Sequence, residues 1–316
     1  MPHILIIILS IALGIAVLVL LAAYLAARRT FYSHPKKRGT PDVLPKGEQY
    51  QKLRDQVREM VQNLQSIPFE WVEITSNDGL KLRARYYHLR DGAPVGILVH
   101  GYRGNAIRDF CGGVVFCMEE KMNVLLIDQR GQGESEGRWM TFGIRERYDL
   151  KQWIEYIINR CGKDTDIMLY GISMGGATVL LSAGLNLPQN VRGILADCPF
   201  SSPKDIIKKV CGDMHLPAGI VYPLIRLGAK LFAGFDPNGA TAAEAVKHAK
   251  MPVALIHGGD DRFVPCEMSR EIANARPECV QLHIFEGAGH GISYMQDKER
   301  YRAIIREFAK TSLERE

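Results

Sequence analysis

One stretch, residues 170–177, constrains the fold of this 316-residue chain more than any other. It reads Tyr-Gly-Ile-Ser-Met-Gly-Gly-Ala, continues an apolar run that begins at residue 167, and leads directly into a helical pattern. Gly171 and Gly175 lack the side chains that would collide where a strand and a helix close around one strained residue. The pattern therefore predicts a nucleophile elbow, a strand–turn–helix unit that holds Ser173 at the end of a sheet.

Short apolar runs alternate with helical patterns through most of the chain after residue 68. The runs predict strands at 95–99, 124–127, 167–170, 191–196, 253–256 and 280–285, and the helical patterns lie at 106–120, 148–160, 174–185 and 300–308. Residues 69–75 and 80–89 flank a hairpin signal, Asn-Asp-Gly, and predict an antiparallel pair. We therefore expect an α/β domain over 68–316, with a mostly parallel sheet covered by helices on both faces.

Residues 201–250 break this rhythm. They are rich in Gly and Pro, and the apolar groups at 220–225 and 231–232 have no obvious strand partner. We interpret the segment as a small helical cap over the catalytic end of the sheet, which would exclude water and give the pocket an apolar wall. An ordinary pair of core helices lengthened by loops is the alternative.

The amino end predicts a membrane anchor over residues 1–29. Residues 4–27 carry no charge, and only Ser10, Gly14 and Tyr24 interrupt the aliphatic side chains. At about 1.5 Å per residue such a helix crosses a hydrocarbon core of about 30 Å. A cleaved signal peptide fits less well, because no Lys or Arg precedes the run and no Ala-x-Ala site closes it. A core helix fits less well still, because the segment has no polar face.

The basic excess of the chain is confined to the flank of this anchor. The only charged side chains before Asp42 are Arg28, Arg29, Lys36, Lys37 and Arg38, and without them 35 basic residues face 35 acidic ones. A basic flank marks the cytoplasmic side of a spanning helix, so we expect a single-pass protein of the cell membrane with its domain in the cytoplasm. The cations could contact anionic headgroups or form a solvated linker. The balanced body has no basic stripe for nucleic acid.

Residues 30–67 are predicted to connect the anchor to the domain. Pro41 and Pro45 mark an extended spacer. Apolar residues then recur at helical spacing, which predicts an amphipathic helix built on Tyr50, Leu53, Val57, Met60, Val61 and Leu64. We expect this helix to pack on the neighbouring domain, and contact with a membrane surface or a second copy is the alternative.

Ser173 needs a general base, a group that orients the base, and donors for an oxyanion. Three further glycine-bearing loops leave predicted strands at their carboxyl ends and therefore face the same edge of the sheet. They read His-Gly-Tyr-Arg-Gly-Asn at 100–105, His-Gly-Gly-Asp-Asp-Arg-Phe-Val-Pro at 257–265, and Glu-Gly-Ala-Gly-His-Gly at 286–291.

The elbow and these three loops, in their order along the chain, resemble the motifs of the serine α/β-hydrolases. The overall pattern is closest to membrane-anchored, Bem46-like members and to serine aminopeptidase S33-like hydrolases. The resemblance covers about residues 68–309 and implies the α/β-hydrolase fold. It also implies that Ser173 is the nucleophile, His290 the general base and acid, and Asp261 the carboxylate that orients the imidazole. The backbone N–H groups of Tyr102 and Met174 would form the oxyanion hole.

Other polar residues near these loops are expected to have structural roles. The family pattern places the catalytic acid at Asp261, so the neighbouring Asp260 is expected to cap its loop. We expect His100 and His257 to hold loop backbone and Asp128 to bond the turn that follows it. The seven cysteines show no zinc or redox spacing and suit a reducing compartment, and Cys198 is expected to be a packed apolar residue rather than a second nucleophile.

The resulting hypothesis is a membrane-anchored serine hydrolase that cleaves a carboxylic ester, or a related acyl bond, of a small-molecule or lipid-like substrate. The chemistry needs neither a metal nor an organic cofactor. A peptidase or amidase, or an acyltransferase, would use the same three side chains. A catalytically idle, membrane-tethered binding module is the alternative from another class. The sequence leaves the oligomeric state open.

Overall fold

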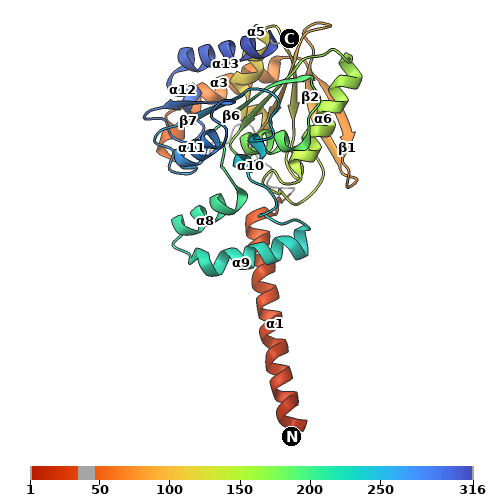
Figure 1. Ribbon diagram of the computed structural model, residues 1–316, viewed down its shortest axis with the longest axis vertical. Coiled ribbons are helices and arrows are strands. Elements are labelled where there is room, and N and C mark those ends of the chain that lie inside the picture. The colour runs from red at the N-terminus through yellow and green to blue at the C-terminus, as the bar shows by residue number, and fades with distance from the viewer. Residues whose placement is uncertain (1, 35–46, 315–316) are drawn as a thin grey trace.

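The computed structural model describes residues 2–34 and 47–314. Its body is one eight-stranded sheet in the order β1-β2-β4-β3-β5-β6-β7-β8 (Figure 1). The strands are β1 (Glu70–Thr75), β2 (Lys81–Tyr87), β3 (Val95–Val99), β4 (Asn123–Ile127), β5 (Ile167–Ile172), β6 (Val191–Asp197), β7 (Val253–Gly258) and β8 (Val280–Phe285). The β1–β2 and β2–β4 pairings are antiparallel and the other five are parallel, so the predicted mostly parallel sheet with an antiparallel opening pair is confirmed.

Helices cover both faces of this sheet. One face packs on α6 (Glu146–Cys161), α7 (Met174–Ser182), α10 (Ala242–Val246) and α11 (Cys266–Ala275). The other packs on α3 (Arg54–Ser66), α5 (Cys111–Glu119) and α13 (Lys298–Leu313). The central strands are buried from end to end, as parallel strands between two helical layers must be.

Two predicted helices are each broken in the structure. The helix expected over 106–120 is divided at Phe110 into α4 (Ala106–Asp109) and α5, and the Asn105 side chain caps α4 by accepting from the next backbone N–H groups. The helix expected around residues 50–64 is α2 (Glu48–Gln51) followed by α3. The predicted packing of its apolar face on the domain is confirmed, because Val61 and Leu64 are fully buried in the core beside α5. The predicted spacer and the basic residues 36–38 lie outside the described residues.

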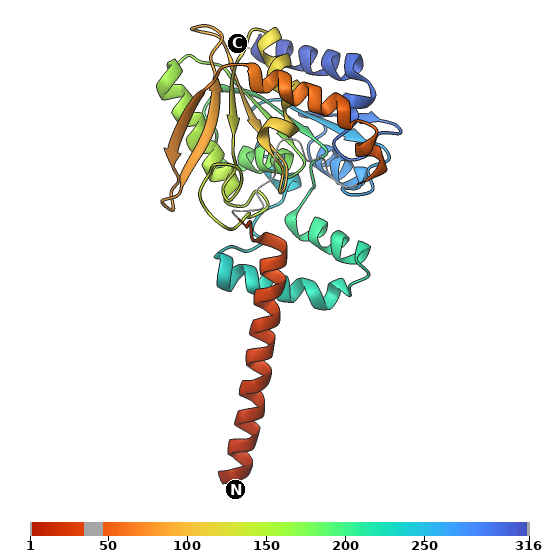
Figure 2. The same ribbon diagram turned by 180° about the vertical axis from the view of Figure 1, so that it is seen from behind.

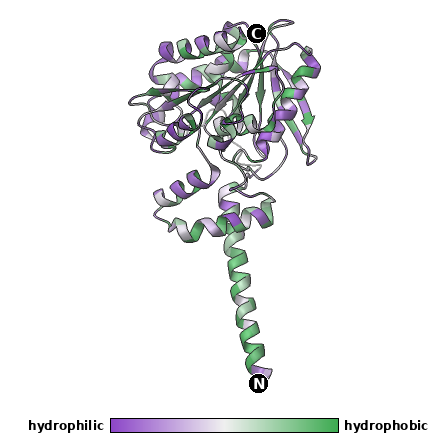
Figure 3. Ribbon diagram, viewed as in Figure 1, coloured by the Kyte–Doolittle hydropathy of each residue, from purple (hydrophilic) through white to green (hydrophobic). Residues whose placement is uncertain are grey.

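Helix α1 (Pro2–Phe31) extends away from the body as an almost uniformly hydrophobic rod (Figures 1 and 3). Among the described residues, it is the one helix that is long and apolar enough to cross a membrane. The protein does not bury its most apolar stretch. A core helix of the domain would be covered on at least one face. The apolar helix is therefore a candidate membrane anchor.

The segment between β6 and β7 projects from the sheet toward α1. Helices α8 (Pro203–Asp213) and α9 (Ala218–Gly228) and the π-helical turn η3 (Ala229–Ala233) lie outside the body, and α9 crosses α1 near its carboxyl end (Figures 1 and 2). Ala23, Ala27 and Phe31 are fully buried there. The chain then returns to the body, where α10 packs against the sheet.

Candidate active site

The turn between β5 and α7 holds Ser173 in a strained backbone conformation, with φ 55° and ψ −118°. A Cβ atom on Gly175 would collide with the backbone of Val99, and one on Gly171 would collide with the backbone of Gly175. The Ser173 N–H donates to the carbonyl of Asp197 at the end of β6 (2.8 Å). These close backbone contacts hold the turn in the geometry that the Gly-x-Ser-x-Gly pattern predicts.

The structure brings Ser173, His290 and Asp261 together from three different loops. His290 Nε2 lies 3.0 Å from Ser173 Oγ, and Nδ1 lies 2.6 Å from Asp261 Oδ2. The ionised carboxylate can only accept, so Nδ1 carries the proton and Nε2 is free to accept the serine proton. The Asp261 side chain is fully buried, whereas the imidazole keeps a narrow exposed edge. This is the arrangement that lets an imidazole act as a general base.

The surroundings of Asp261 keep it ionised. Burial alone would raise the pKa of this carboxyl group, but His257 and His290, together with the backbone N–H of Val264, hold its pKa below the usual range. His290 contacts one carboxylate oxygen, and the N–H groups of Phe263 and Val264 donate to the other (2.9 and 2.8 Å). A fixed negative charge therefore faces Nδ1 of the imidazole.

The backbone N–H groups of Met174 and Tyr102 are the candidate donors to an oxyanion at Ser173. Met174 is the first residue of α7, where N–H groups have no partner within the helix. The loop before Tyr102 passes directly by the nucleophile, because a Cβ on Gly101 would lie 3.4 Å from the Ser173 Cβ. Within residues 2–34 and 47–314, neither the Met174 nor the Tyr102 N–H has an acceptor. The Tyr102 hydroxyl donates to the carbonyl of Thr30 in α1 (2.7 Å), which fixes this loop against the anchor helix.

Most of the remaining polar residues have the structural roles that the sequence predicts. His100 accepts from the Gln129 N–H and bonds the carbonyl of Gly101, and both histidines predicted to be structural are completely buried. His257 contacts Ser269 Oγ and the carbonyl of Val264.

Of the two aspartates expected to have structural roles, only Asp128 has the role that the sequence predicts. Asp128 accepts from the Glu134 N–H in the turn that follows it (3.0 Å), as expected, and pairs with Arg85. The prediction for Asp260 is wrong: its exposed side chain holds no hydrogen bond in the described structure, and its backbone N–H bonds Ala288 instead.

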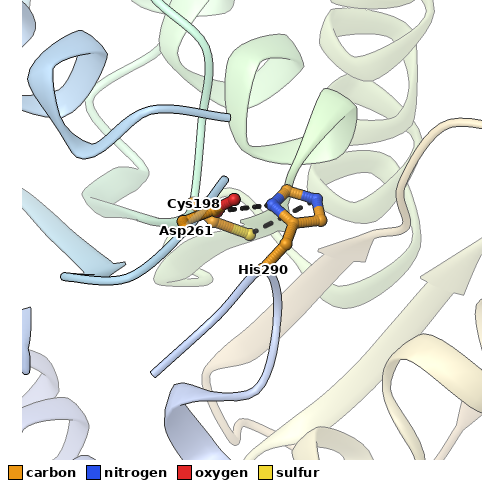
Figure 4. Close-up of side chains that lie close together, drawn as sticks. All are labelled: Cys198, Asp261 and His290. Atoms are coloured by element: carbon orange, nitrogen blue, oxygen red, sulfur yellow. Dashed lines mark hydrogen bonds and ion pairs between the residues drawn. The ribbon is translucent and has the colours of Figure 1, made fainter. Parts of the chain in front are cut away.

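Cys198 lies closer to the site than the sequence suggests. Its Sγ is 4.0 Å from His290 Nε2, and Figure 4 shows the thiol, the Asp261 carboxylate and the imidazole gathered together. Burial raises the pKa of the thiol well above its usual value, and the nearby Asp197 raises it further. A metal fits this group poorly, because both imidazole nitrogens are already engaged and the thiol resists deprotonation. Cys198 is a packed neighbour of the site.

A cavity of about 1030 Å³ opens beside Ser173 and His290. Its walls come mainly from the helices on one side of the sheet, and its apolar lining includes Leu53, Val57, Met60, Leu98, Phe110, Phe116, Leu195 and Ile305. No residue of the predicted cap, 201–250, is among its described lining residues, so the expectation that the cap walls the pocket is wrong. That wall is built by α2 and α3. The Tyr50 hydroxyl there donates to the carbonyl of His290 (2.8 Å).

Comparisons with known proteins agree with the α/β-hydrolase fold. A family model described as serine aminopeptidase, S33, matches residues 95–232. The uncharacterised protein YqkD of Bacillus subtilis is 26% identical over 213 residues, which cover 67% of this chain and 70% of that protein. Protein bem46 of Schizosaccharomyces pombe is 25% identical over 288 residues, covering 85% and 87%. The solved esterase Pf2001 of Pyrococcus furiosus superposes with a TM-score of 0.64 at 23% identity, covering 79% of this chain and 93% of that one.

A second buried carboxylate borders the cavity and was not singled out by the sequence. Asp197 is the last residue of β6 and is 4% exposed. Its Oδ2 accepts from the Tyr301 hydroxyl (2.9 Å), while its Oδ1 has no partner among the described residues. Burial is the main reason that its pKa is raised from 3.8 to about 6. The folded protein therefore holds a proton here over a pH range in which the unfolded chain has released it.

We predict that Asp197→Asn changes the pH dependence of stability. The folded form of the parent binds the extra proton between pH 3.8 and about 6, so its free energy of unfolding falls as pH rises through that window. The shift corresponds to about 3 kcal/mol at neutral pH. The asparagine variant, which has no charge to bury, should gain stability relative to the parent as pH rises from 4 to 7. Urea unfolding at pH 4 and pH 7 measures the free energy of unfolding of both proteins. An equal change in this free energy for the parent and the variant would contradict the prediction.

Proposed function

We propose that this chain, which has the α/β-hydrolase fold and motifs like those of its serine-type members, is a membrane-anchored enzyme that cleaves a carboxylic ester or a related acyl bond. The observation that carries this proposal is the continuous contact from Ser173 Oγ through the imidazole of His290 to Asp261. Each of the three groups comes from a different loop. A merely structural serine has no need of a base that is itself oriented by a buried carboxylate.

The proposed reaction is acyl transfer to water. Ser173 Oγ attacks the substrate carbonyl while His290 Nε2 removes its proton, and the N–H groups of Met174 and Tyr102 bind the resulting oxyanion. The imidazolium then protonates the leaving group, which departs and leaves an acyl-enzyme. His290 next removes a proton from water, and the hydroxide oxygen attacks the acyl carbon. Asp261 stabilises the imidazolium in both halves without taking its proton.

The cavity favours an acyl group with an aliphatic portion. Many of its lining residues are aliphatic or aromatic, and its volume exceeds that of a short acyl chain. The solved neighbour that superposes on this chain is named an esterase, which supports the same bond. The matched family is described as an aminopeptidase, so cleavage of an amide is the alternative to be tested beside it.

We further propose that α1 spans the cell membrane with the catalytic domain on the cytoplasmic side. The exposed apolar length of the helix needs a nonaqueous surrounding, and Arg28 and Arg29 occupy its last turn next to the domain. The similarity to protein bem46 covers 85% of this chain, which is more than the predicted hydrolase domain alone.

The first prediction from this proposed function concerns the nucleophile. A fluorophosphonate probe should label the full-length protein, and Ser173→Ala should abolish the label because the reactive oxygen is removed. Asp261→Asn should slow labelling by about 10³ to 10⁴, because the wrong imidazole tautomer is then favoured. Label intensity over time measures both effects.

Ser312→Ala is the matched control for labelling. Ser312 is also buried, and its hydroxyl has no partner among the described residues, but it lies in α13 away from the elbow. This variant should label like the parent. Labelling that persists in Ser173→Ala, or is absent from the parent, would favour the idle binding module.

The second prediction concerns chain length. On p-nitrophenyl esters, kcat/KM should rise with acyl length by up to about fourfold per methylene until the cavity is filled, since each buried CH₂ contributes about 0.8 kcal/mol. Leu53→Trp should remove the advantage of long chains and spare the acetate, because the indole occupies the cavity. Aminoacyl arylamides are assayed in parallel, and faster turnover of these than of any ester would favour the peptidase.

The third prediction concerns topology. Protease added to intact spheroplasts should leave the domain undigested, and the same protease should degrade it after permeabilisation. Proteolysis suits this chain better than thiol labelling, because five of its seven cysteines are buried. Digestion in intact spheroplasts would place the domain on the outer side.

A further inference from the structure

Helix α9 has two apolar faces, one that the protein buries and one that it covers only in part. Tyr222, Ile225 and Gly228 are buried on the inner face. A second stripe, here called the α9 stripe, recurs at intervals of three or four residues on the opposite side and consists of Leu216, Ile220, Leu224, Leu227 and Leu231. Ile220 is 67% exposed and Leu231 57% exposed. Large aliphatic side chains arranged this way on a soluble surface would be costly to leave in water.

The stripe is held at a defined place along α1. A Cβ on Gly228 would collide with the carbonyl of Ala23, so the two helix backbones touch at this point. Phe232, next to the stripe, packs edge-on against Tyr24 with ring centroids 5.1 Å apart. The stripe is therefore attached rigidly to the anchor helix rather than to the distant end of the domain (Figure 1).

That place coincides with the expected edge of the hydrocarbon core. The apolar run of α1 begins at Ile4, and about 20 helical residues at about 1.5 Å each span the hydrocarbon thickness of about 30 Å. The twentieth residue of the run is Ala23, which is the residue that Gly228 contacts. Helix α9 lies across α1 in both views (Figures 1 and 2). It would therefore lie along the surface of a membrane that α1 crosses.

The charges around the stripe suit an anionic surface. Residues 203–236 contain five Lys and Arg against three Asp, a net charge of +2, and Asp236 pairs with Arg226 and Lys230. Arg28 and Arg29 add to it from the last turn of α1. Each Lys or Arg near an anionic leaflet contributes about 1 kcal/mol of attraction. Tyr24, which contacts Phe232, is also a residue type that is enriched at the boundary between headgroups and acyl chains.

We propose that the α9 stripe is a second membrane contact, lying in the boundary between headgroups and acyl chains of the bilayer that α1 spans, with a preference for anionic lipid. This rests on the membrane anchoring proposed above. One spanning helix alone would let the domain swing, whereas a helix in the plane of the surface fixes its orientation. The segment that carries α9 leaves the sheet directly after β6, whose last residue bonds the Ser173 N–H. The contact therefore holds the catalytic edge of the sheet toward the bilayer.

The test measures bromolipid quenching of introduced tryptophans in the full-length protein. Ile220→Trp and Leu231→Trp probe the stripe, Leu13→Trp probes the middle of α1, and Leu89→Trp probes the exposed loop after β2, remote from the anchor. Each is reconstituted in phosphatidylcholine–phosphatidylserine vesicles with bromine placed either near the carbonyl or near the chain end. The signal of the three native tryptophans, measured in the parent, is subtracted.

Both stripe variants should lose fluorescence mainly with the shallow bromines, Leu13→Trp mainly with the deep bromines, and Leu89→Trp with neither. Quenching of Leu13→Trp without quenching of either stripe variant would overturn the proposal and leave the anchor intact. Absence of quenching in all variants would remove the anchor as well. Unquenched stripe variants that form cross-linked dimers would assign the stripe to a second copy. Far-UV circular dichroism melts identical to the parent's establish that each variant is folded.

Discussion

The close approach of two backbones at the elbow is the constraint on which the site depends. Gly175 has no Cβ, so the first turn of α7 can pack against the carbonyl of Val99, and Gly171 lets the same turn close on β5. Ser173 is thereby held at a positive φ, with its hydroxyl toward the imidazole and the N–H of Met174 at an open helix start. A larger residue at either glycine would move the Ser173 hydroxyl away from the imidazole and from the N–H of Met174.

The parallel sheet then determines where the other groups meet the serine. Loops that leave β7 and β8 at their carboxyl ends carry Asp261 and His290 to the same edge. Buried N–H donors and two histidines compensate the desolvation of Asp261, so that its charge persists beside the imidazole. Asp197, one strand away, accepts one hydrogen bond, from Tyr301, which does not offset its burial, and it is driven toward its neutral form. Neighbouring carboxyl groups thus differ in charge because their hydrogen bonds differ.

The cavity wall that a helical cap was expected to provide comes from a different part of the chain. Helices α2 and α3 wall the cavity, and Tyr50 reaches the backbone of His290. The insertion that carries α8 and α9 packs on α1 instead. Under the proposed arrangement the cavity wall and the membrane contact are therefore separate elements. An acyl substrate drawn from the bilayer would meet an enzyme whose catalytic edge already faces it.

Local signals in the sequence determined the strands, the elbow, the exposed apolar helix and the order of the three catalytic candidates, because glycine requirements and hydrophobic periodicity act over a few residues. They also placed His100, His257 and Asp128 in structural roles. The break at Phe110, the exposed side chain of Asp260, the wall formed by Tyr50 and the contact between Gly228 and Ala23 were decided only by the tertiary structure. Each of these depends on which distant surfaces meet, and contacts between residues some 200 positions apart leave no periodic trace in a single chain.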